Sequence, residues 1–371
     1  MSEETDDKTR KDDHTLHENL GTQPLVRHKV FNNPDVITVG WFPACPSSEL
    51  ARGAARSLVI FKQRVVLFRG QDREVRALDA FCPHMGADLG NGAVIDNELQ
   101  CYFHRWRFDG GGKLTVIPNC DRRPANARVN AYPTQEKYGW IWVFSRAGEA
   151  PYPVPSPPGL EDAEVDAVHL GSPLLFAHHH VMMANGIDLQ HFATVHDLDV
   201  DFEYTVETSR PDVFEWDLSG AVPTERLKHR LMAKLVGPKV GYRARFAGGS
   251  FVALTYGPNQ RFAGTGFKLP PLHIVWGCLP TLDAVSRVHI FITTKKRKGP
   301  FGWLASRLLV LLTIVLLIVL RDDDVKAFPN MRFNPRNLVD ADRSVARLVQ
   351  LTDTLEVSDW SGPPPGDKKR S

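Results

Sequence analysis

The chain has 371 residues, a formal net charge of +2 and 43% hydrophobic residues, which is the composition of a globular protein with a full core. Its basic residues form no stripe, so the charge pattern argues against nucleic-acid binding. The length favours two domains, and five cysteines without a dense pattern argue against a secreted disulfide scaffold.

Residues 1–30 are predicted to be a disordered tail, because they are rich in charge and poor in apolar side chains. The first twenty contain no apolar region of the kind found in signal peptides, so we expect a cytoplasmic protein. Beyond the tail, the residue pattern predicts short strands separated by charged or glycine-containing turns. These strands are expected at 36–42, 57–61, 64–68, 75–78 and 139–144.

Two pairs of metal-binding residue types lie in the loops that follow the fourth of these strands. Cys82 and His84 form the first pair, and Cys101 and His104 form the second. A structural zinc finger usually groups two cysteines in one pair and two histidines in the other, whereas each pair here has one of each. The mixed pattern favours a two-iron cluster in which two cysteines hold one iron and two histidines hold the other.

The pattern Cys-x-His-x16-Cys-x2-His, with Gly86, Gly90 and Gly92 in the intervening loop, resembles the Rieske [2Fe-2S] domain. The resemblance implies that the four residues named above are the cluster ligands. It also implies a small β-sandwich, which we assign to residues 31–150. The glycines would let the two loops fold tightly around the cluster sulfurs.

Residues 151–165 are rich in proline and are predicted to be a stiff linker. A strand is expected after it, over 174–181. His178, His179 and His180 fall in this strand, where neighbouring side chains point to opposite faces. The three histidines are therefore not expected to share a metal ion.

A second metal-binding pattern follows, Asn185-x2-Asp188-x2-His191-x4-His196. Two side chains five residues apart point about 140° away from each other on a straight helix, so the helix should end or distort between the histidines. The pattern resembles the mononuclear iron motif of the Rieske non-heme iron oxygenases. The resemblance makes His191 and His196 ligands of a mononuclear Fe(II).

In that family an N-terminal all-β Rieske sandwich precedes a helix-grip catalytic domain, in which a curved antiparallel sheet covers the iron helices, so the expected class is α+β. We assign the catalytic domain to residues 166–358 and a second disordered tail to 359–371. Two closing helices are expected at 301–321 and 340–356. The strands of the sheet are predicted at 202–206, 214–218, 242–246, 251–256, 274–278 and 288–294.

A site with two histidines and one carboxylate needs an acidic residue from further along the chain. Asp322, Asp323 and Asp324 are adjacent candidates, and Asp340 and Asp342 are others. In the family, the carboxylate begins a helix that has an aliphatic residue three positions on, and this register favours Asp324, with Asp323 as the alternative. An acidic triplet could equally complement the dipole of a following helix.

The resemblance also assigns Asp188 to an electron bridge between subunits. The bridge would run from a cluster histidine, His104, through the carboxylate of Asp188 in a neighbouring subunit to His191. A closed homotrimer is the simplest assembly that repeats this contact head to tail. A local salt bridge on the helix is the alternative role for Asp188, and Asn185 is expected to face the iron cavity or to support a ligand.

Residues 308–320 form an apolar run without charge. A spanning helix needs about 20 apolar residues, so this run is too short. Because it ends four residues before Asp324, we expect a buried helix that lines a lipophilic cavity. The alternative is a peripheral contact with a membrane surface through residues 303–320.

The family resemblance implies a terminal oxygenase component that takes electrons from a reductase or ferredoxin, activates O2 at Fe(II) and oxidises a small apolar or aromatic substrate. Two alternatives remain open: oxidative cyclisation or desaturation on the same centres, and an electron-transfer protein with a vestigial second domain. Lys295-Lys296, the apolar helix and Asp324-Val-Lys resemble the aminopyrrolnitrin-type arylamine oxygenases. Residues 328–331 depart from the tryptophan-containing segment of that group, so N-oxygenation of an aryl amine is one suggestion among others.

Overall fold

The computed structural model describes residues 28–120, 124, 126–195, 200–222, 230, 239–257, 268, 270–281, 285–327, 331 and 333–362. At 201, 316 and 319–327 only the backbone is described. His196 therefore lies outside the described residues, and the acidic triplet 322–324 is described without its side chains.

The N-terminal half of the described chain forms three small antiparallel sheets, as the short predicted strands required. The first contains β1 (Trp41–Pro46), β11 (Trp140–Phe144) and β10 (Thr134–Lys137). The second contains β2 (Ala55–Ile60), β3 (Gln63–Arg69), β4 (Val75–Asp79) and β9 (Ala131–Tyr132). The third contains β5 (Ala93–Ile95), β6 (Glu98–Gln100), β7 (Arg107–Phe108) and β8 (Leu114–Val116).

The C-terminal half is built on one eight-stranded antiparallel sheet with the order β12-β19-β18-β17-β16-β15-β14, and β13 pairs with β19 outside this path. Its strands are β12 (Val165–Gly171), β13 (Leu174–Leu175), β14 (Asp201–Arg210), β15 (Val213–Ala221), β16 (Lys239–Ala247), β17 (Phe251–Tyr256), β18 (Leu272–Pro280) and β19 (Ser286–Lys295). All six strands predicted for this sheet are present. In β15 apolar and polar residues alternate, whereas β17 is buried on both faces because each face packs against another part of the chain.

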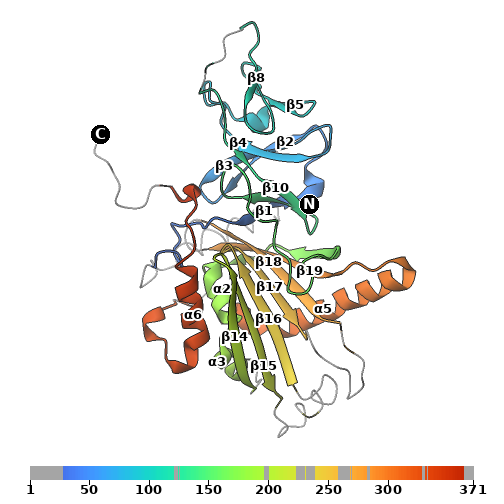
Figure 1. Cartoon of the computed structure of the whole chain (residues 1–371), viewed down its shortest axis with the longest axis vertical. Coiled ribbons are helices and arrows are strands. Elements are labelled where there is room, and N and C mark those ends of the chain that lie inside the picture. Colours follow the sequence, from blue (N-terminus) through green and yellow to red (C-terminus); the bar gives the residue numbers. More distant parts are fainter. Residues whose placement is uncertain are drawn as a thin grey trace, which may run out of the picture.

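Helices cover one face of this sheet (Figure 1). They are α2 (His179–Asn185), α3 (Leu189–Thr194), α5 (Gly299–Ala327) and α6 (Arg343–Thr352), with short 3-10 turns η1 (Ser47–Glu49), η2 (Leu89–Asn91), η5 (Pro335–Asn337), η6 (Asp340–Asp342) and η7 (Asp359–Ser361). The helix α3 ends at Thr194, so the prediction that the helix ends between the two motif histidines is confirmed.

Strand β17 shows how the two faces of the sheet are used. Val252 and Leu254 pack against α2 and α6 in one buried cluster. Phe251 and Ala253, which alternate with them, pack against Trp142 of β11 in another. The Rieske-like half therefore lies on the face opposite the helices, and the two halves share a continuous apolar contact.

The structure corrects three sequence expectations. The strand expected at 174–181 ends at Leu175, and the helix α2 starts at His179 with His178 as its N-cap. Val30, placed in the N-terminal tail, is buried in the same cluster as α6. Trp360, placed in the C-terminal tail, is buried among residues of β3 and β11. Each of these residues is stabilised by segments that are distant in sequence.

The long helix α5 is not the buried helix that its apolar sequence favoured. It packs on β18 and β19 through Val310, but a row of leucines on its outer side is exposed. It also continues through the acidic triplet to Ala327, so no new helix begins at Asp324. None of the helices in the described part of the chain combines the length and apolar character that crossing a bilayer requires.

Candidate metal centres

The four predicted cluster ligands lie in the loops beside the β5–β8 sheet. The thiols of Cys82 and Cys101 are buried and interact with each other. The rings of His84 and His104 are exposed, with their centroids 4.6 Å apart. Two thiols on the inner side and two imidazoles on the outer side fit a [2Fe-2S] cluster with one iron on each side.

The two ligand loops have the same backbone hydrogen bonds. In the first, Cys82 N–H donates to Ala87 O (2.9 Å) and Gly86 N–H donates to Cys82 O (2.9 Å). In the second, Cys101 N–H donates to Trp106 O (2.8 Å) and Arg105 N–H donates to Cys101 O (3.1 Å). Gly86 and Arg105 both have positive φ, +75° and +61°. The two Cys-His pairs therefore lie on matched turns, although only the first has glycine at the left-handed position.

The aromatic ring of Trp106 is a part of this centre that the sequence did not reveal. It stacks on His84 with centroids 4.3 Å apart and an interplanar angle of 6°. The only sequence signal for Trp106 is its place two residues after His104, in the turn that repeats the first loop.

Burial and the neighbouring Cys101 raise the pKa of the Cys82 thiol to about 11, so iron must displace a proton when it binds there.

The second motif lies on the turn between α2 and α3, under the eight-stranded sheet. The Tyr242 hydroxyl from β16 donates to Gly186 O, and the Ser344 hydroxyl from α6 donates to Ile187 O (2.7 Å). These contacts fix the turn from two sides. Neither contact could be predicted from the sequence, because both residues lie more than 50 positions away from the motif.

Asn185 and His191 meet at this turn. The Asn185 Nδ2 atom lies 3.3 Å from His191 Nε2, and His191 is only 9% exposed. A metal ion on this imidazole nitrogen would therefore lie next to the Asn185 amide. Of the predicted iron ligands, the structure describes the side chain of His191, whose buried imidazole is a suitable ligand for Fe(II).

Asp188 is the N-cap of α3 rather than a residue within the helix. Its Oδ1 accepts hydrogen bonds from Gln190 N–H (3.0 Å) and His191 N–H (3.2 Å). The carboxylate thus fixes the backbone of His191, the predicted iron ligand, as an N-cap does. The bridging role of Asp188 stays a prediction.

Asp340 and Asp342, the other candidates for the carboxylate ligand, lie in η6 and make contacts of their own. Asp342 accepts hydrogen bonds from the Gln190 side chain (2.6 Å) and from Val339 N–H (2.8 Å). The Asp340 side chain is 96% exposed and lies near Arg343. These contacts favour capping and surface roles, so the triplet at the end of α5 remains the source of the predicted third ligand.

His178, His179 and His180 are buried and offer ligand atoms within 4.8 Å of one another, contrary to the expectation from strand alternation. His180 Nδ1 accepts from Asn32 N–H (3.0 Å), and His178 Nδ1 accepts from His180 N–H (3.3 Å). These contacts leave the proton of each neutral ring on Nε2. A metal ion would need the lone pair at Nε2, so the cluster favours neutral, structural histidines.

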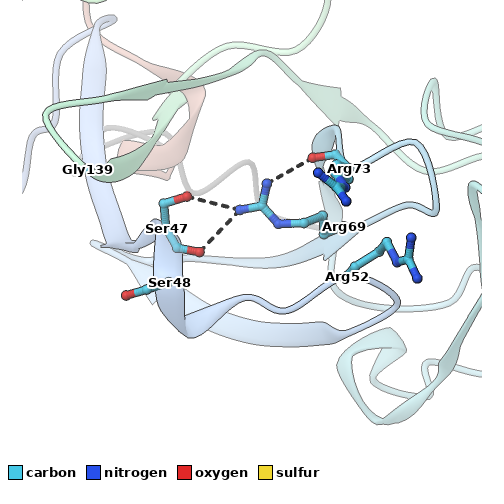
Figure 2. Close-up of a pocket in the computed structure, with 6 residues that line it drawn as sticks. All are labelled: Ser47, Ser48, Arg52, Arg69, Arg73 and Gly139. Atoms are coloured by element: carbon cyan, nitrogen blue, oxygen red, sulfur yellow. Dashed lines mark hydrogen bonds between the residues drawn. The ribbon is translucent and has the colours of Figure 1, made fainter.

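One hollow near the Rieske-like sheets is separate from both centres. It has a volume of about 720 Å³ and is lined by Ser47, Ser48, Arg52, Arg69, Arg73 and Gly139. Figure 2 shows the Arg69 guanidinium directed at Ser47, to whose carbonyl and hydroxyl it donates. Arg69 also pairs with Glu136 (2.8 Å), so this cation serves the local fold.

Comparison with known proteins agrees with the geometry. Residues 40–133 match the Rieske [2Fe-2S] domain family. The fold matches dicamba monooxygenase bound to 3,6-dichlorosalicylic acid, with a TM-score of 0.57, 21% identity and coverage of 85% of this chain and 98% of that chain. It also matches Pseudomonas putida CBB5 NdmA with caffeine, with a TM-score of 0.57, 17% identity and coverage of 85% and 94%. Residues 40–133 therefore match the Rieske [2Fe-2S] domain, and the chain as a whole shares the two-part fold of these solved structures.

Two of the curated relatives are named for steroid substrates. Cholesterol 7-desaturase of Drosophila melanogaster is 32% identical over 46% of this chain and 41% of that protein. The oxygenase component of 3-ketosteroid-9-alpha-monooxygenase from Mycolicibacterium smegmatis is 32% identical over 44% of each. The aligned parts span less than half the length of these relatives. The comparisons therefore support the oxygenase class without singling out the arylamine group that the chain's final segment resembles.

Proposed function

We propose that the chain is a terminal oxygenase component that oxidises an apolar, ring-containing substrate with O2. The observation that supports the proposal is that two separate groups of predicted metal ligands lie on one fold. Cys82, His84, Cys101 and His104 form the first, and buried His191 beside Asn185 belongs to the second. When bound, the cluster supplies electrons one at a time and the Fe(II) supplies O2 activation.

The protein's own residues would position this chemistry. His191 and His196 would hold the iron together with Asp324, or with Asp323 in the alternative register. Asp188 orients His191 through its backbone N–H, and the Asn185 amide faces the metal-binding nitrogen. Because Asp188 caps α3, it holds the backbone of His191 rather than its ring.

The relative positions of the two centres favour an oligomer. Figure 1 shows the β5–β8 sheet at one end of the long axis and α3 near the other, so the centres of one chain are well separated. His104 is exposed and Asp188 is half-buried, so a neighbouring subunit can bring them together. We therefore propose a head-to-tail homotrimer, with a reductase or ferredoxin as the electron donor.

The surroundings of His191 favour an apolar substrate. The ring centroids of His191 and Phe192 are 6.1 Å apart, and Phe192 in turn contacts Phe202 (5.3 Å) and Tyr242 (5.6 Å). Aromatic side chains bind flat apolar rings well. Two of the curated relatives are named for the oxidation of steroids, so steroids are the first substrate class to test and aryl amines are the second.

The test is to incubate the reduced enzyme with 3-ketosteroids and with aryl amines under ¹⁸O2 and to analyse the products by mass spectrometry. One labelled oxygen in a product would establish a monooxygenase, and two would establish a dioxygenase. A product lighter by two hydrogens without label would establish desaturation or cyclisation, the alternative reaction on the same centres. The control is His191→Ala, which should keep the visible spectrum of the cluster and form no product.

Metal content tests the ligand assignment separately from the substrate. A complete chain should contain about three irons, two in the cluster and one mononuclear. Asp324→Ala should lose about one iron per chain and keep the spectrum of the cluster. The matched variant Asp323→Ala should keep all of the iron, and the opposite result would move the ligand to Asp323. A wild-type protein with only about two irons would support a pure electron carrier.

A further inference from the structure

The helix α5 has its polar and apolar residues on unexpected sides. Ser306, Val310 and Thr313 are buried against the sheet. The Thr313 hydroxyl donates to Leu309 O (2.8 Å), and Arg297 donates to the Ser306 hydroxyl (3.4 Å). Two hydroxyls thus occupy the inner side of the helix, where an amphipathic helix of a globular protein places its apolar residues.

The outer side of α5 is apolar instead. Its large side chains are between 48% and 87% exposed and recur every three or four residues, so they form one continuous stripe along the helix. We call this stripe the outer face. Its members are Phe301, Leu304, Leu308, Leu311, Leu312, Val315 and Ile318, and the exposed Trp303 lies beside it in the first turn of the helix. Exposed apolar patches of this extent mark interaction sites.

Cations border the outer face where the helix begins. Lys295, Lys296 and Lys298 are exposed just before α5, and the Arg307 guanidinium lies over the Trp303 ring at 5.5 Å. Lys296 pairs with Glu164 (3.2 Å). Within the described part of the chain, the other three cations form no ion pair, so this end of the helix carries excess positive charge. Figure 1 shows that α5 (orange) extends past the edge of the sheet here.

We propose that the outer face of α5 docks on the surface of an anionic lipid bilayer. The helix would lie in the plane of the interface, with its leucines in the acyl region and its lysines at the headgroups. Tryptophan is favoured at this depth because its ring is apolar and its N–H is polar. The cationic border selects an anionic surface, since it adds electrostatic attraction to the apolar contact.

This surface also gives the proposed function a route for substrate, and that extension rests on the proposed function. Trp276 and Ile290 contact both the α5 cluster and the α2–α6 cluster, so α5 and the iron motif lie on the same face of the sheet. The C-terminal end of α5 carries the acidic triplet. A membrane-dissolved apolar substrate would therefore reach the oxygenase along the helix that supplies its third ligand.

The test is flotation of the full chain with vesicles of phosphatidylcholine alone and of phosphatidylcholine mixed with phosphatidylglycerol. The protein should float with the mixed vesicles, and high salt should weaken binding because it screens the lysines. Substituting Leu304, Leu308 and Leu311 together by Gln should reduce binding by at least about tenfold, since three buried leucines are lost from the bilayer. Lys295→Glu with Lys298→Glu should remove the preference for the anionic vesicles.

The matched control is Val59→Gln, an exposed apolar residue on β2 in the N-terminal half, which should leave flotation unchanged. An unchanged visible spectrum of the cluster would show that each variant is folded. Equal flotation of wild type and the triple leucine variant would overturn the proposal. The proposal would also be overturned if the wild type did not bind vesicles but formed an oligomer, and the triple leucine variant did not form that oligomer. The outer face would then be a contact between copies of the chain. Neither readout depends on the substrate or on turnover.

Discussion

Asp188 can serve two purposes because its two carboxylate oxygens are used differently. Its Oδ1 caps α3 by accepting from the backbone N–H groups of Gln190 and His191, whereas Oδ2 accepts no hydrogen bond from the described residues. The sequence motif predicted a role beside His191, but the cap became visible only in the structure. A carboxylate with one oxygen on the ligand's backbone and one oxygen available can both hold α3 and bridge to a neighbouring subunit.

Two substitutions separate these purposes. Asp188→Asn keeps a side-chain oxygen for the cap, so the melting temperature and the iron content should not change, while turnover should fall by about 10–100-fold. Asp188→Ala should lose turnover and also about 1 kcal/mol of unfolding free energy, because the cap is gone. Steady-state oxidation and thermal unfolding would measure the two effects. Normal turnover in Asp188→Asn would contradict the bridge.

His179 makes stability depend on pH. Burial lowers its pKa to about 4 in the folded chain, whereas the ordinary value is 6.5. The unfolded chain therefore takes up a proton on this residue between pH 6.5 and 4 while the folded chain does not, so the unfolding free energy should fall as pH is lowered through this range. The loss attributable to His179 should be at most about 3 kcal/mol. Urea titrations at several pH values should show a shallower slope for His179→Gln, and an unchanged slope would exclude this origin.

The spacing of metal-binding residues was predictable and their supporting contacts were not. Cys82 and Cys101 stand out because thiol and imidazole recur at short, repeated intervals. The burial of His178 to His180 depends on Asn32 and Gly249, which lie far away in sequence. Three histidines in a row fit a strand as well as a helix start, and only the tertiary contacts decide between the two.

At the scale of elements, strands were easier to predict than helices. In β15, Phe214, Trp216 and Leu218 alternate with polar residues, and this two-residue period is visible without a structure. The apolar run in α5 shows no such contrast between its faces, so the sequence could not tell which side packs on the sheet. Ser306 and Thr313 mark the inner side in the structure, but two hydroxyls among apolar residues do not identify the packed side of a helix by themselves.

The helix α6 supports the turn between α2 and α3 through the buried Ser344 hydroxyl, which donates to Ile187 O (2.7 Å). Ser344→Ala should leave this carbonyl without its partner and cost about 1–3 kcal/mol of unfolding free energy. Mononuclear iron should also be lost more readily to a chelator, while the spectrum of the cluster stays unchanged. The control is Ser48→Ala at an exposed position of η1. Equal iron retention in the two variants would show that α6 does not steady the site.

At the scale of the molecule, the two halves meet where β18 crosses β1 and β11. A Cβ atom on Gly277 would lie 2.7 Å from Cη2 of Trp142 and 2.9 Å from Cγ of Pro43. Trp142 is fully buried and its indole N–H is bonded to Lys137 O, so the ring has little room to move. The close approach of the halves therefore depends on the absence of a side chain at this position.

Gly277→Ala should lower the unfolding free energy by about 1–3 kcal/mol, because the added methyl overpacks the contact. Thermal unfolding monitored by tryptophan fluorescence would measure the loss. Gly111→Ala is the matched control, since its nearest atom would be 3.4 Å away and its backbone is not left-handed. Equal stability of the two variants would mean that the two halves can move apart slightly without a loss of unfolding free energy.

Trp360 has a consequence for the order in which the protein can fold. Its ring packs edge-on against Tyr132 (5.0 Å) within the core of the Rieske half, and Ser358 N–H donates to Ile37 O (2.9 Å). A ribosome adds about 5–20 residues per second, so Trp360 emerges roughly 10–40 s after β11 is complete. During that interval the first domain to be synthesised has a gap in its core that only the last part of the catalytic half can close. Assembly of the cluster in a growing chain would therefore take place in an unfinished domain, and a fragment ending after β11 would stay in that state.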